Sequence, residues 1–384
     1  MDLSLTESEQ RFAHEVRAWL EANVVPAPDT DDLAEQVAWG RTWQARLADA
    51  GWVGINWPVD YGGRGASPVD VAIFNAEYAR SGAPQLVNRV GINLAGPTLL
   101  AHGTPEQCRR WLPAIVRAEE IWCQLFSEPG AGSDLSGLVT RAEPVDDGAG
   151  GWRVTGQKVW TSYAQFARYG LCLARTEPGT TGPRGLSLLV VDIEAAGVEI
   201  RPLVQITGEA EFNEVFLEDV VVPPGHLVGP AGQGWMVAST TLAHERGTNF
   251  PFKEEVVHEG YLTRLFAQAA SNGTLDDPDV ADALVDAYVA LVVLRTHNWR
   301  TLSKLARGEE PGPESSWVKL TWSDMTQQMS EAALAVQGSA SGMWGPWQRQ
   351  WLWSKAASIA GGTSEVQRNV IGERLLGLPR EQRR

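Results

Sequence analysis

The chain has little cysteine, no cluster of basic residues and no long apolar run. Its three cysteines, Cys108, Cys123 and Cys172, form no close pair and are odd in number, which is typical of a reduced intracellular protein rather than of a disulfide framework. No stretch approaches about 18 uninterrupted apolar residues, so we expect no transmembrane helix. The N-terminal segment MDLSLTESEQRFAHEVRAWL is amphipathic and acidic, unlike a signal peptide. We therefore expect a cytoplasmic protein that does not insert into membranes.

Positive charge is also scarce. The 384 residues include 47 Asp and Glu against 32 Lys and Arg, a formal net charge of −15. An acidic chain without a basic run is a poor partner for nucleic acid or anionic lipid. An anionic ligand would therefore need a local pocket of Arg, Lys and backbone N–H groups. The composition, 43% hydrophobic and 21% charged, is that of an ordinary globular protein, long enough for two or three domains.

The pattern along the chain changes twice. Capping signals at Thr6 and Thr104 and apolar periodicity predict that residues 1–120 are mostly helical. Short runs rich in Val, Leu and Ile predict a β domain over 121–225, without the long helices of a parallel α/β sheet. Residues 226–384 are predicted to be helical again, with helices near 232–246, 253–271, 279–307, 314–337 and 363–375. The fold class is α+β, in the order α, β, α.

The segment QLFSEPGAGSDL predicts a tight turn that can bind a ligand. Pro129, Gly130 and Gly132 allow backbone N–H groups to approach a bound molecule, and Ser127 and Ser133 add hydroxyls. The segment lacks the G-x-G-x-x-G spacing that opens a helix after a strand, so it does not indicate a dinucleotide-binding fold. A plain Ser/Gly turn without a ligand is the alternative interpretation.

The segment QGWMVASTTLAHERG places a carboxylate on an apolar helix face. At about 100° per residue, Glu245 falls on the stripe formed by Trp235, Ala238 and Leu242. Glutamate is rarely buried unless it is paired or used in chemistry. One interpretation is a buried structural pair between Glu245 and Arg246, and the other is a catalytic carboxylate.

Over nearly its whole length the chain resembles the acyl-CoA dehydrogenases. Five segments carry the resemblance, in the family's order and spacing: GINWPVDYGGRG at 54–65, SEPGAGSD at 127–134, GQKVWTS at 156–162, FNEVFLEDVVVP at 212–223 and GGTSEVQRNVIGERLLGLPR at 361–380. The resemblance implies an N-terminal helical domain (1–120), a middle β-barrel-like domain (121–225) and a C-terminal four-helix bundle (226–384). It also implies FAD as cofactor, an acyl-CoA thioester as substrate and a trans-2-enoyl-CoA as product. It implies no metal.

The resemblance assigns residues to the cofactor by position. It places Phe126, Ser127, Gly132 and Ser133 along the flavin ring, Trp160 against the ring, Ser162 near its reactive edge, and Thr363 and Glu365 at the adenosine half. Such a ring needs donors that stabilise its reduced, anionic form and a wall that excludes water. The alternatives are plain strand packing for Trp160 and helix capping for Thr363.

The sequence departs from the family at the catalytic base. Many members carry a Glu directly before the late GTS, where this chain has Gly361. Members resembling isovaleryl- and long-chain acyl-CoA dehydrogenases carry a Glu-Arg dipeptide on the first bundle helix instead, which here falls on Glu245 and Arg246. We therefore predict that Glu245 removes the α proton, with its pKa raised by burial, and that Arg246 positions it or the pocket. His244 points about 100° away and is a weaker candidate.

A second departure concerns partners. Many members supply an Arg-x-x-Phe-Gly segment from a neighbouring subunit to the FAD pyrophosphate, but this chain has AQAASNGTLDDPD there. Either a homo-oligomer holds FAD in a modified way, or a paralogous subunit completes the site in a heteromer, as in relatives that process steroid side-chain thioesters. The resemblance implies electron-transfer flavoprotein as the acceptor. A flavin monooxygenase or oxidase and a non-catalytic subunit are the alternative functions.

Overall fold

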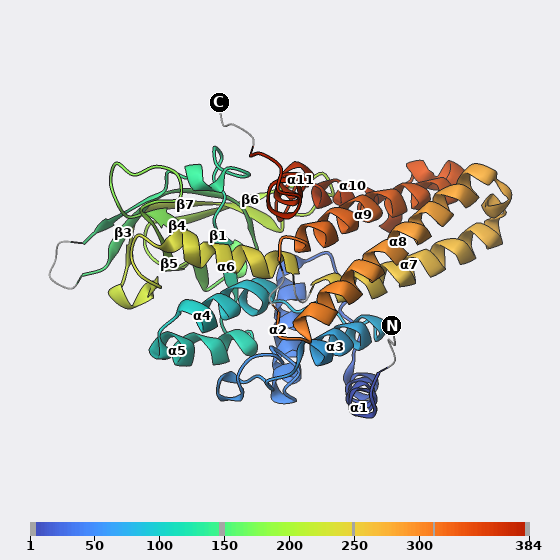
Figure 1. Ribbon diagram of the computed structural model, residues 1–384, viewed down its shortest axis with the longest axis horizontal. Coiled ribbons are helices and arrows are strands. Elements are labelled where there is room, and N and C mark those ends of the chain that lie inside the picture. The colour runs from blue at the N-terminus through green and yellow to red at the C-terminus, as the bar shows by residue number, and fades with distance from the viewer. Residues whose placement is uncertain (1–4, 146–149, 248–249, 310–311, 381–384) are drawn as a thin grey trace. The chain divides into compact units, whose positions relative to one another are not determined.

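The computed structural model describes residues 5–145, 150–247, 250–309 and 312–380; the side chains of 245–252 lie outside that description. The chain forms two compact units (Figure 1). Unit 1 comprises Met1–Val25, Ser67–Ala83 and Arg246–Arg384, and unit 2 comprises Pro26–Ala66 and Pro84–Glu245.

Unit 2 is built around an eight-stranded sheet in the order β6-β7-β3-β2-β4-β5-β8, with β1 paired to β4. The strands are β1 Trp122–Leu125, β2 Arg141–Pro144, β3 Trp152–Ser162, β4 Tyr169–Arg175, β5 Leu186–Asp192, β6 Val198–Leu203, β7 Phe212–Val222 and β8 Leu227–Val228. The neighbours β4 and β5 are buried along nearly their whole length, which explains their continuous apolar sequences. Pairing is antiparallel except for β4 with β1 and with β2.

The helices of unit 2 are α2 Leu33–Asp49, α4 Gly96–His102, α5 Pro105–Val116 and α6 from Gly234 onward. A short π-helix at Gly91–Ala95 precedes α4. The predicted start of α5 is confirmed, because Thr104 accepts a hydrogen bond from the Gln107 N–H at 3.2 Å and Pro105 takes the first helical position.

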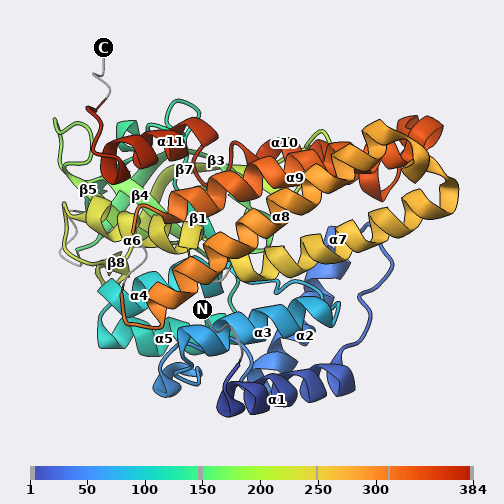
Figure 2. The ribbon, with the colours of Figure 1, turned by 45° about the vertical axis from the view of Figure 1, so that its right-hand side comes forward.

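Unit 1 is helical. Its elements are α1 Glu7–Asn23, α3 Pro68–Arg80, α7 Phe250–Asn272, α8 Pro278–Leu305, α9 Ser315–Gln337, α10 Pro346–Ala357 and α11 Ser364–Val370, followed by a π-helix at Ile371–Leu375. The helices α7, α8 and α9 pack side by side around a core of Leu, Val, Ala and Met, and α10 lies against α9 (Figure 2). The sequence predicted every long helix of this unit after residue 250 but missed α10.

The N-terminal helices belong to this helical unit. Helix α3 packs against both α1 and α7. Arg17 on α1 makes two hydrogen bonds to the buried carboxylate of Glu77 on α3, at 2.9 and 3.0 Å. Burial by itself would raise the pKa of Glu77, but the charges and hydrogen bonds of Arg17 and Arg80 lower it. The pair therefore fixes α1 to α3.

The described residues were also compared with the requirements of a membrane-spanning helix and of a metal site. Among the described residues, no helix is long and apolar enough to cross a membrane. Within the same residues, no group of three or more His, Cys, Asp or Glu side chains is placed to hold a metal ion.

Candidate active site

The Ser/Gly segment after β1 forms the tight turn that the sequence predicted. Glu128 and Ala131 exchange backbone hydrogen bonds in both directions, at 3.1 and 3.0 Å, with Pro129 and Gly130 at the tip. A Cβ added at Gly130 or at Gly132 would meet no atom within 4 Å. The outer side of the turn is therefore open to a ligand.

A buried lysine anchors this turn to the neighbouring strand. Lys158 on β3 is fully buried, and its ammonium group contacts Glu128 Oε1 at 2.9 Å. It also donates to the carbonyl oxygens of Phe126 at 3.0 Å and Leu173 at 2.8 Å. All three ammonium protons thus have acceptors, as a buried charge requires.

Glu128 is the matching buried carboxylate. Besides Lys158, it accepts backbone N–H bonds from Val139 at 2.7 Å and Thr140 at 2.9 Å. Burial alone would raise the pKa of Glu128, but the Lys158 charge and these hydrogen bonds lower it. Sequence reasoning missed this pair. The available signal was that Lys158 shares the strand face of the buried Val154.

Trp160 is presented to the outside of unit 2. The pairing of β3 with β7 shifts register between Lys158 and Thr161, which marks a β-bulge. Trp160 lies in this bulge with φ of +59°, a strained backbone for a side chain of this size, and is 62% exposed. Its ring meets Phe212 edge-on at a centroid distance of 6.1 Å. Plain strand packing would have buried the indole.

The turn and the Trp160 strand are tied side by side. Val159 N–H donates to the Ser127 carbonyl at 2.9 Å. Ser133 is exposed and Ser162 is half-buried at the end of β3. Phe126, in contrast, has a buried side chain, and its carbonyl oxygen accepts from Lys158. An open glycine turn, the exposed Ser133 hydroxyl and an exposed indole fit a flat aromatic ring such as isoalloxazine.

Helix α6 extends from Gly234 to Gly247 and is held firmly in unit 2 up to Glu245. A Cβ on Gly234 would lie 2.4 Å from Ser187 Cα, so only glycine allows this close approach. The buried Thr241 and Thr98 hydroxyls are 2.8 Å apart, which joins α6 to α4. His102 Nε2 and the Thr240 hydroxyl, 2.7 Å apart, make a second link.

The buried face of α6 is shifted from the predicted stripe. Val237, Ala238 and Thr241 are fully buried, whereas Trp235 and Leu242 are half-buried. The predicted catalytic side chains, Glu245 and Arg246, lie outside the described residues. The backbone of position 245 follows Thr241 by one helical turn.

His244 is half-buried on the same helix. Burial lowers the pKa of its imidazole, which favours the neutral ring.

The late GTS segment belongs to unit 1. Thr363 caps α11, accepting from the Val366 N–H at 3.2 Å, and Glu365 is exposed. Helix capping, the alternative for Thr363, is therefore present.

Gly361, at the position where many family members carry a Glu, has φ of +66°, a left-handed backbone that disfavours side chains. In the described part of the chain, the buried Ser364 hydroxyl and Gln367 Oε1 have no hydrogen-bond partner, so this segment retains donor and acceptor capacity for a ligand.

Three family models cover the chain in succession. They are the acyl-CoA dehydrogenase N-terminal domain at residues 6–119, the middle domain at 123–220 and the C-terminal domain at 232–376. The chain belongs to the acyl-CoA dehydrogenase family. The predicted fold class and enzyme class are thereby confirmed, and FAD dependence is general to this family.

The chain is similar to a mycobacterial member of the family in sequence and to two solved structures in fold. The acyl-CoA dehydrogenase IpdE1 of Mycolicibacterium smegmatis is 42% identical over 97% of this chain and 98% of its own length. A structure described as the Tcur3481-Tcur3483 steroid ACAD has a TM-score of 0.87 and 28% identity, covering 99% of this chain and 100% of that one. The ChsE4-ChsE5 complex from Mycobacterium tuberculosis has a TM-score of 0.84 and 30% identity, covering 100% of both.

Proposed function

We propose that this chain is an FAD-dependent acyl-CoA dehydrogenase that converts a bulky, steroid-derived acyl-CoA into the trans-2-enoyl-CoA. The observation that carries the proposal is the open turn at 127–133, locked by Lys158 and Glu128 against the strand that presents Trp160. The steroid-derived acyl group is supported by the neighbour described as a steroid ACAD.

The proposed cofactor contacts come from the family resemblance and are supported, for the turn and Trp160, by the exposure of the residues. The flavin ring would lie on the outer side of the turn and against the Trp160 indole, with the residues Phe126 (through its backbone N–H), Ser127, Gly132, Ser133 and Ser162 around it. Thr363 and Glu365 would hold the adenosine half. When bound, FAD supplies the acceptor for the substrate hydride at N5.

The acid–base chemistry is assigned to Glu245. Its carboxylate would accept the proton from the carbon α to the thioester, and bound FAD would supply the acceptor for the hydride from the β carbon, which leaves a C=C bond between the two carbons. The support is the position of residue 245 on α6 and the left-handed backbone of Gly361, which is unsuited to a glutamate. Arg246 would orient Glu245.

The electron acceptor is proposed to be electron-transfer flavoprotein, and the site is proposed to be completed by a second subunit. The turn between α7 and α8 has the sequence SNGTLDDPD. It contains no Lys or Arg that could bind a pyrophosphate. Two solved neighbours are described by pairs of components, which supports a paralogous partner.

The purified chain should be colourless when expressed alone and yellow when coexpressed with its paralogous partner. The reason is that the missing basic residue leaves the pyrophosphate without a charge-assisted contact. The visible absorption spectrum measures this directly. Flavin bands near one FAD per chain without any partner would instead establish a complete site in a homo-oligomer.

Replacing Trp160 with Ala should lower the affinity for FAD by about tenfold or more, because an exposed indole that covers a ring contributes stacking and excludes water. Trp344→Ala is the matched control, since Trp344 is 65% exposed against 62% for Trp160. Flavin fluorescence during titration of the FAD-free, coexpressed complex gives both dissociation constants. Equal affinities in the two variants would contradict a role for Trp160 at the ring.

The substrate class has its own test. Under anaerobic conditions, a steroid-derived acyl-CoA should bleach the flavin bands of the holoenzyme, whereas palmitoyl-CoA should not. The reverse preference would refute the bulky acyl group while leaving the dehydrogenase intact. Rapid oxygen consumption after reduction would favour the flavin oxidase instead.

A further inference from the structure

Helix α6 carries the proposed base, and its backbone belongs to unit 2 up to that residue. Unit 2 ends at Glu245, and the next residue, Arg246, already belongs to unit 1. The turn at 127–133 and Trp160 also lie in unit 2. The position of residue 245 relative to this turn is therefore set by the contacts that hold α6 inside unit 2.

The first of these contacts lies at the start of α6. Gly234 packs directly on the backbone of Ser187 in β5, and the N–H of Gly232 donates to the Ser187 hydroxyl at 2.9 Å. Gly234 lies eleven residues before residue 245, which is about three helical turns. This contact fixes where α6 begins, and a second one is needed to fix its last turn.

The second contact lies one turn before residue 245. The hydroxyls of Thr241 on α6 and Thr98 on α4 are both fully buried and 2.8 Å apart. Thr98 donates its own proton to the carbonyl of Leu94 at 2.7 Å, so its oxygen accepts from Thr241. The other acceptor within reach of Thr241, the carbonyl of Val237, is farther away at 3.4 Å. Thr241 therefore makes a directed hydrogen bond to an acceptor that is itself held in place.

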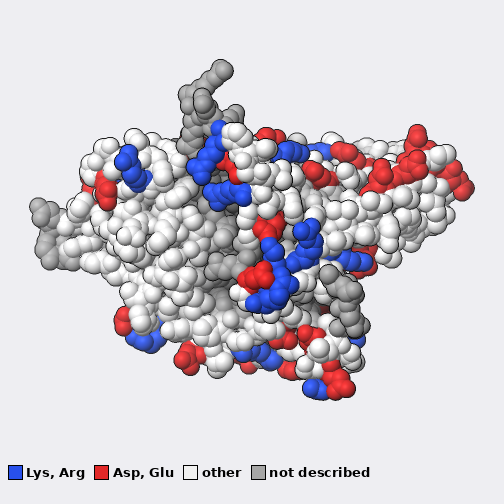
Figure 3. All heavy atoms as spheres, in the orientation of Figure 1, with Lys and Arg blue, Asp and Glu red and all other residues white. Residues whose placement is uncertain are grey.

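Apolar side chains surround this pair of hydroxyls. Leu99 of α4 and Val237 and Ala238 of α6 are fully buried. Neither α4 nor residues 234–244 of α6, all of which the structure describes, include Asp, Glu, Lys or Arg, and charged side chains are sparse on the side of unit 2 that faces the viewer in Figure 3. A buried hydroxyl that loses its partner costs free energy, whereas apolar packing is less directional. The hydroxyl pair therefore selects one position of α6 on α4.

The same contact is connected to the strand that leads into the turn. The acceptor of the Thr98 hydroxyl belongs to the π-helix at Gly91–Ala95, and single π turns are frequent at functional sites. The first N–H of this π-helix donates to Asn88 Oδ1 at 3.2 Å, and the same oxygen accepts from the N–H of Trp122 at 2.9 Å. Trp122 is the first residue of β1, which precedes the turn at 127–133. Hydrogen bonds and one short helix thus join the last turn of α6 to the start of β1.

We propose that Thr241 is a positioning residue for the proton transfer. Its hydroxyl holds the last turn of α6 on α4, so that the base at residue 245 reaches the α proton of the thioester. This inference rests on the proposed function of Glu245, and Thr241 itself touches neither substrate nor cofactor. A displacement of about 1 Å at a catalytic group can lower a rate by about a hundredfold, so a contact one helical turn away is close enough to control the reaction.

Thr241→Val should lower the rate of flavin reduction by about tenfold or more, whereas Thr241→Ser should stay within about threefold of the parent. Valine keeps the branched shape and removes the hydroxyl, and Thr98 keeps its own acceptor, so no buried donor is left unpaired. Urea denaturation should therefore show nearly the stability of the parent. Anaerobic stopped-flow absorbance of the FAD-loaded, coexpressed complex measures the rate, with the acyl-CoA that reduces the parent.

A substrate analogue isolates the proton transfer from the hydride transfer. In a 3-thiaacyl-CoA, sulfur replaces the β carbon, so the ligand can lose its α proton but has no β hydride to give. Its enolate beside the oxidised flavin should add a long-wavelength charge-transfer band. At saturating analogue this band should be weaker in Thr241→Val and retained in Thr241→Ser. A loss of folded protein would instead lower all flavin bands in proportion.

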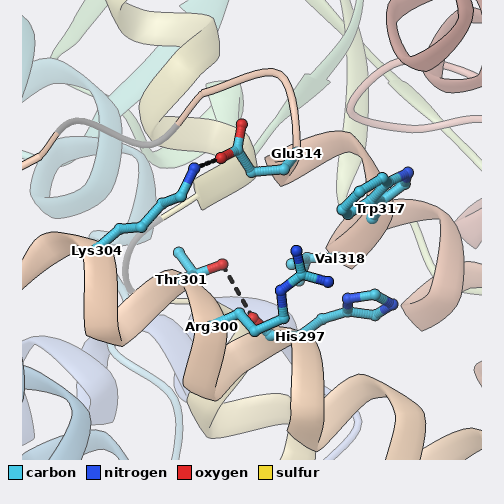
Figure 4. A pocket seen from close by; sticks show the side chains of 7 residues that line it. All are labelled: His297, Arg300, Thr301, Lys304, Glu314, Trp317 and Val318. Atoms are coloured by element: carbon cyan, nitrogen blue, oxygen red, sulfur yellow. Dashed lines mark hydrogen bonds and ion pairs between the residues drawn. The ribbon is translucent and has the colours of Figure 1, made fainter. Parts of the chain in front are cut away.

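Thr301→Val is the matched control. Thr301 is also a buried helical threonine whose hydroxyl donates to the carbonyl four residues earlier, that of His297 at 3.1 Å, but it lies on α8 in unit 1 (Figure 4). We expect this variant to keep the parent rate and the parent band. A parent rate and band in Thr241→Val, or equal losses in Thr241→Val and Thr241→Ser, would overturn the inference and leave Glu245 as the base. If no acyl-CoA reduces the parent, the proposed function fails and this inference fails with it.

Discussion

Glu245→Gln should lower turnover by about a thousandfold or more while the protein keeps its flavin. An amide has nearly the shape of the carboxylate but cannot accept the α proton, and loss of a positioned general base typically costs two to four orders of magnitude. Stopped-flow reduction of the bound flavin under anaerobic conditions measures the step itself. The absorption spectrum before mixing shows whether FAD is retained.

His244→Gln is the matched control for this variant. His244 is adjacent in the chain, is half-buried, and burial lowers its pKa, so it is the nearest competing base. We expect His244→Gln to retain flavin reduction within about tenfold of the parent rate. If Glu245→Gln reduces the flavin at the parent rate, the base lies elsewhere; if His244→Gln alone is inactive, the imidazole is the base.

Lys158→Met should lower the free energy of unfolding by about 3–5 kcal/mol, because it leaves the buried carboxylate of Glu128 without its countercharge. It also removes the donor shared by the Phe126 and Leu173 carbonyls. Urea denaturation followed by tryptophan fluorescence gives the difference. Because this pair fixes the turn at 127–133, the affinity for flavin should decrease together with the stability.

Lys355→Met provides the comparison for Lys158→Met. Lys355 also pairs with a glutamate, Glu331 at 3.1 Å, but the two side chains are 42% and 62% exposed. An exposed pair contributes about 1 kcal/mol or less. Removing the second charge in Lys158→Met with Glu128→Gln should recover part of the loss. If Lys158→Met and Lys355→Met lower the free energy of unfolding equally, burial does not increase the contribution of the Lys158–Glu128 pair.

The destabilisation in Lys158→Met should depend on pH. In the parent, Lys158 and the backbone donors hold the pKa of Glu128 below its ordinary value, so its stabilisation is complete above about pH 4.3 and fades as pH falls through the lower folded pKa. In the variant, the Lys158 charge no longer offsets burial, so the pKa of Glu128 rises above its value in the parent although the two backbone donors remain. The variant is then weakest at neutral pH, and the stability gap should narrow on acidification as Glu128 takes up a proton.

Sequence patterns predicted most elements because their signals are local. The capping box at Thr6 and the proline after Thr104 mark helix starts through contacts within four residues. Helix α10 was missed because PWQRQWLWSKAA mixes large aromatic and polar residues without a clear apolar stripe. The shift of the buried face of α6 likewise reflects its contact with Thr98, about 140 residues away in sequence.

The candidate site likewise contains residues that could be predicted from the sequence and residues that could not. The Gly and Ser positions of the turn and the Trp of β3 could be assigned by resemblance. The buried Lys158–Glu128 pair could not, because it depends on which strands become neighbours. The grouping of α1 and α3 with the helices after residue 246 is also a property of non-local packing.

That grouping has a consequence for how the chain folds as it is synthesised. Helices α1 and α3 leave the ribosome early, but α7, which packs against α3, follows only after all of unit 2 has been made. Until α7 is made, the face of α3 that packs against α7 lacks that partner, while α1 and α3 can already form the ion pair of Arg17 and Glu77. Fragments that begin at residue 246 would leave α7 without α3, so the helical unit is one that the two ends of the polypeptide complete together.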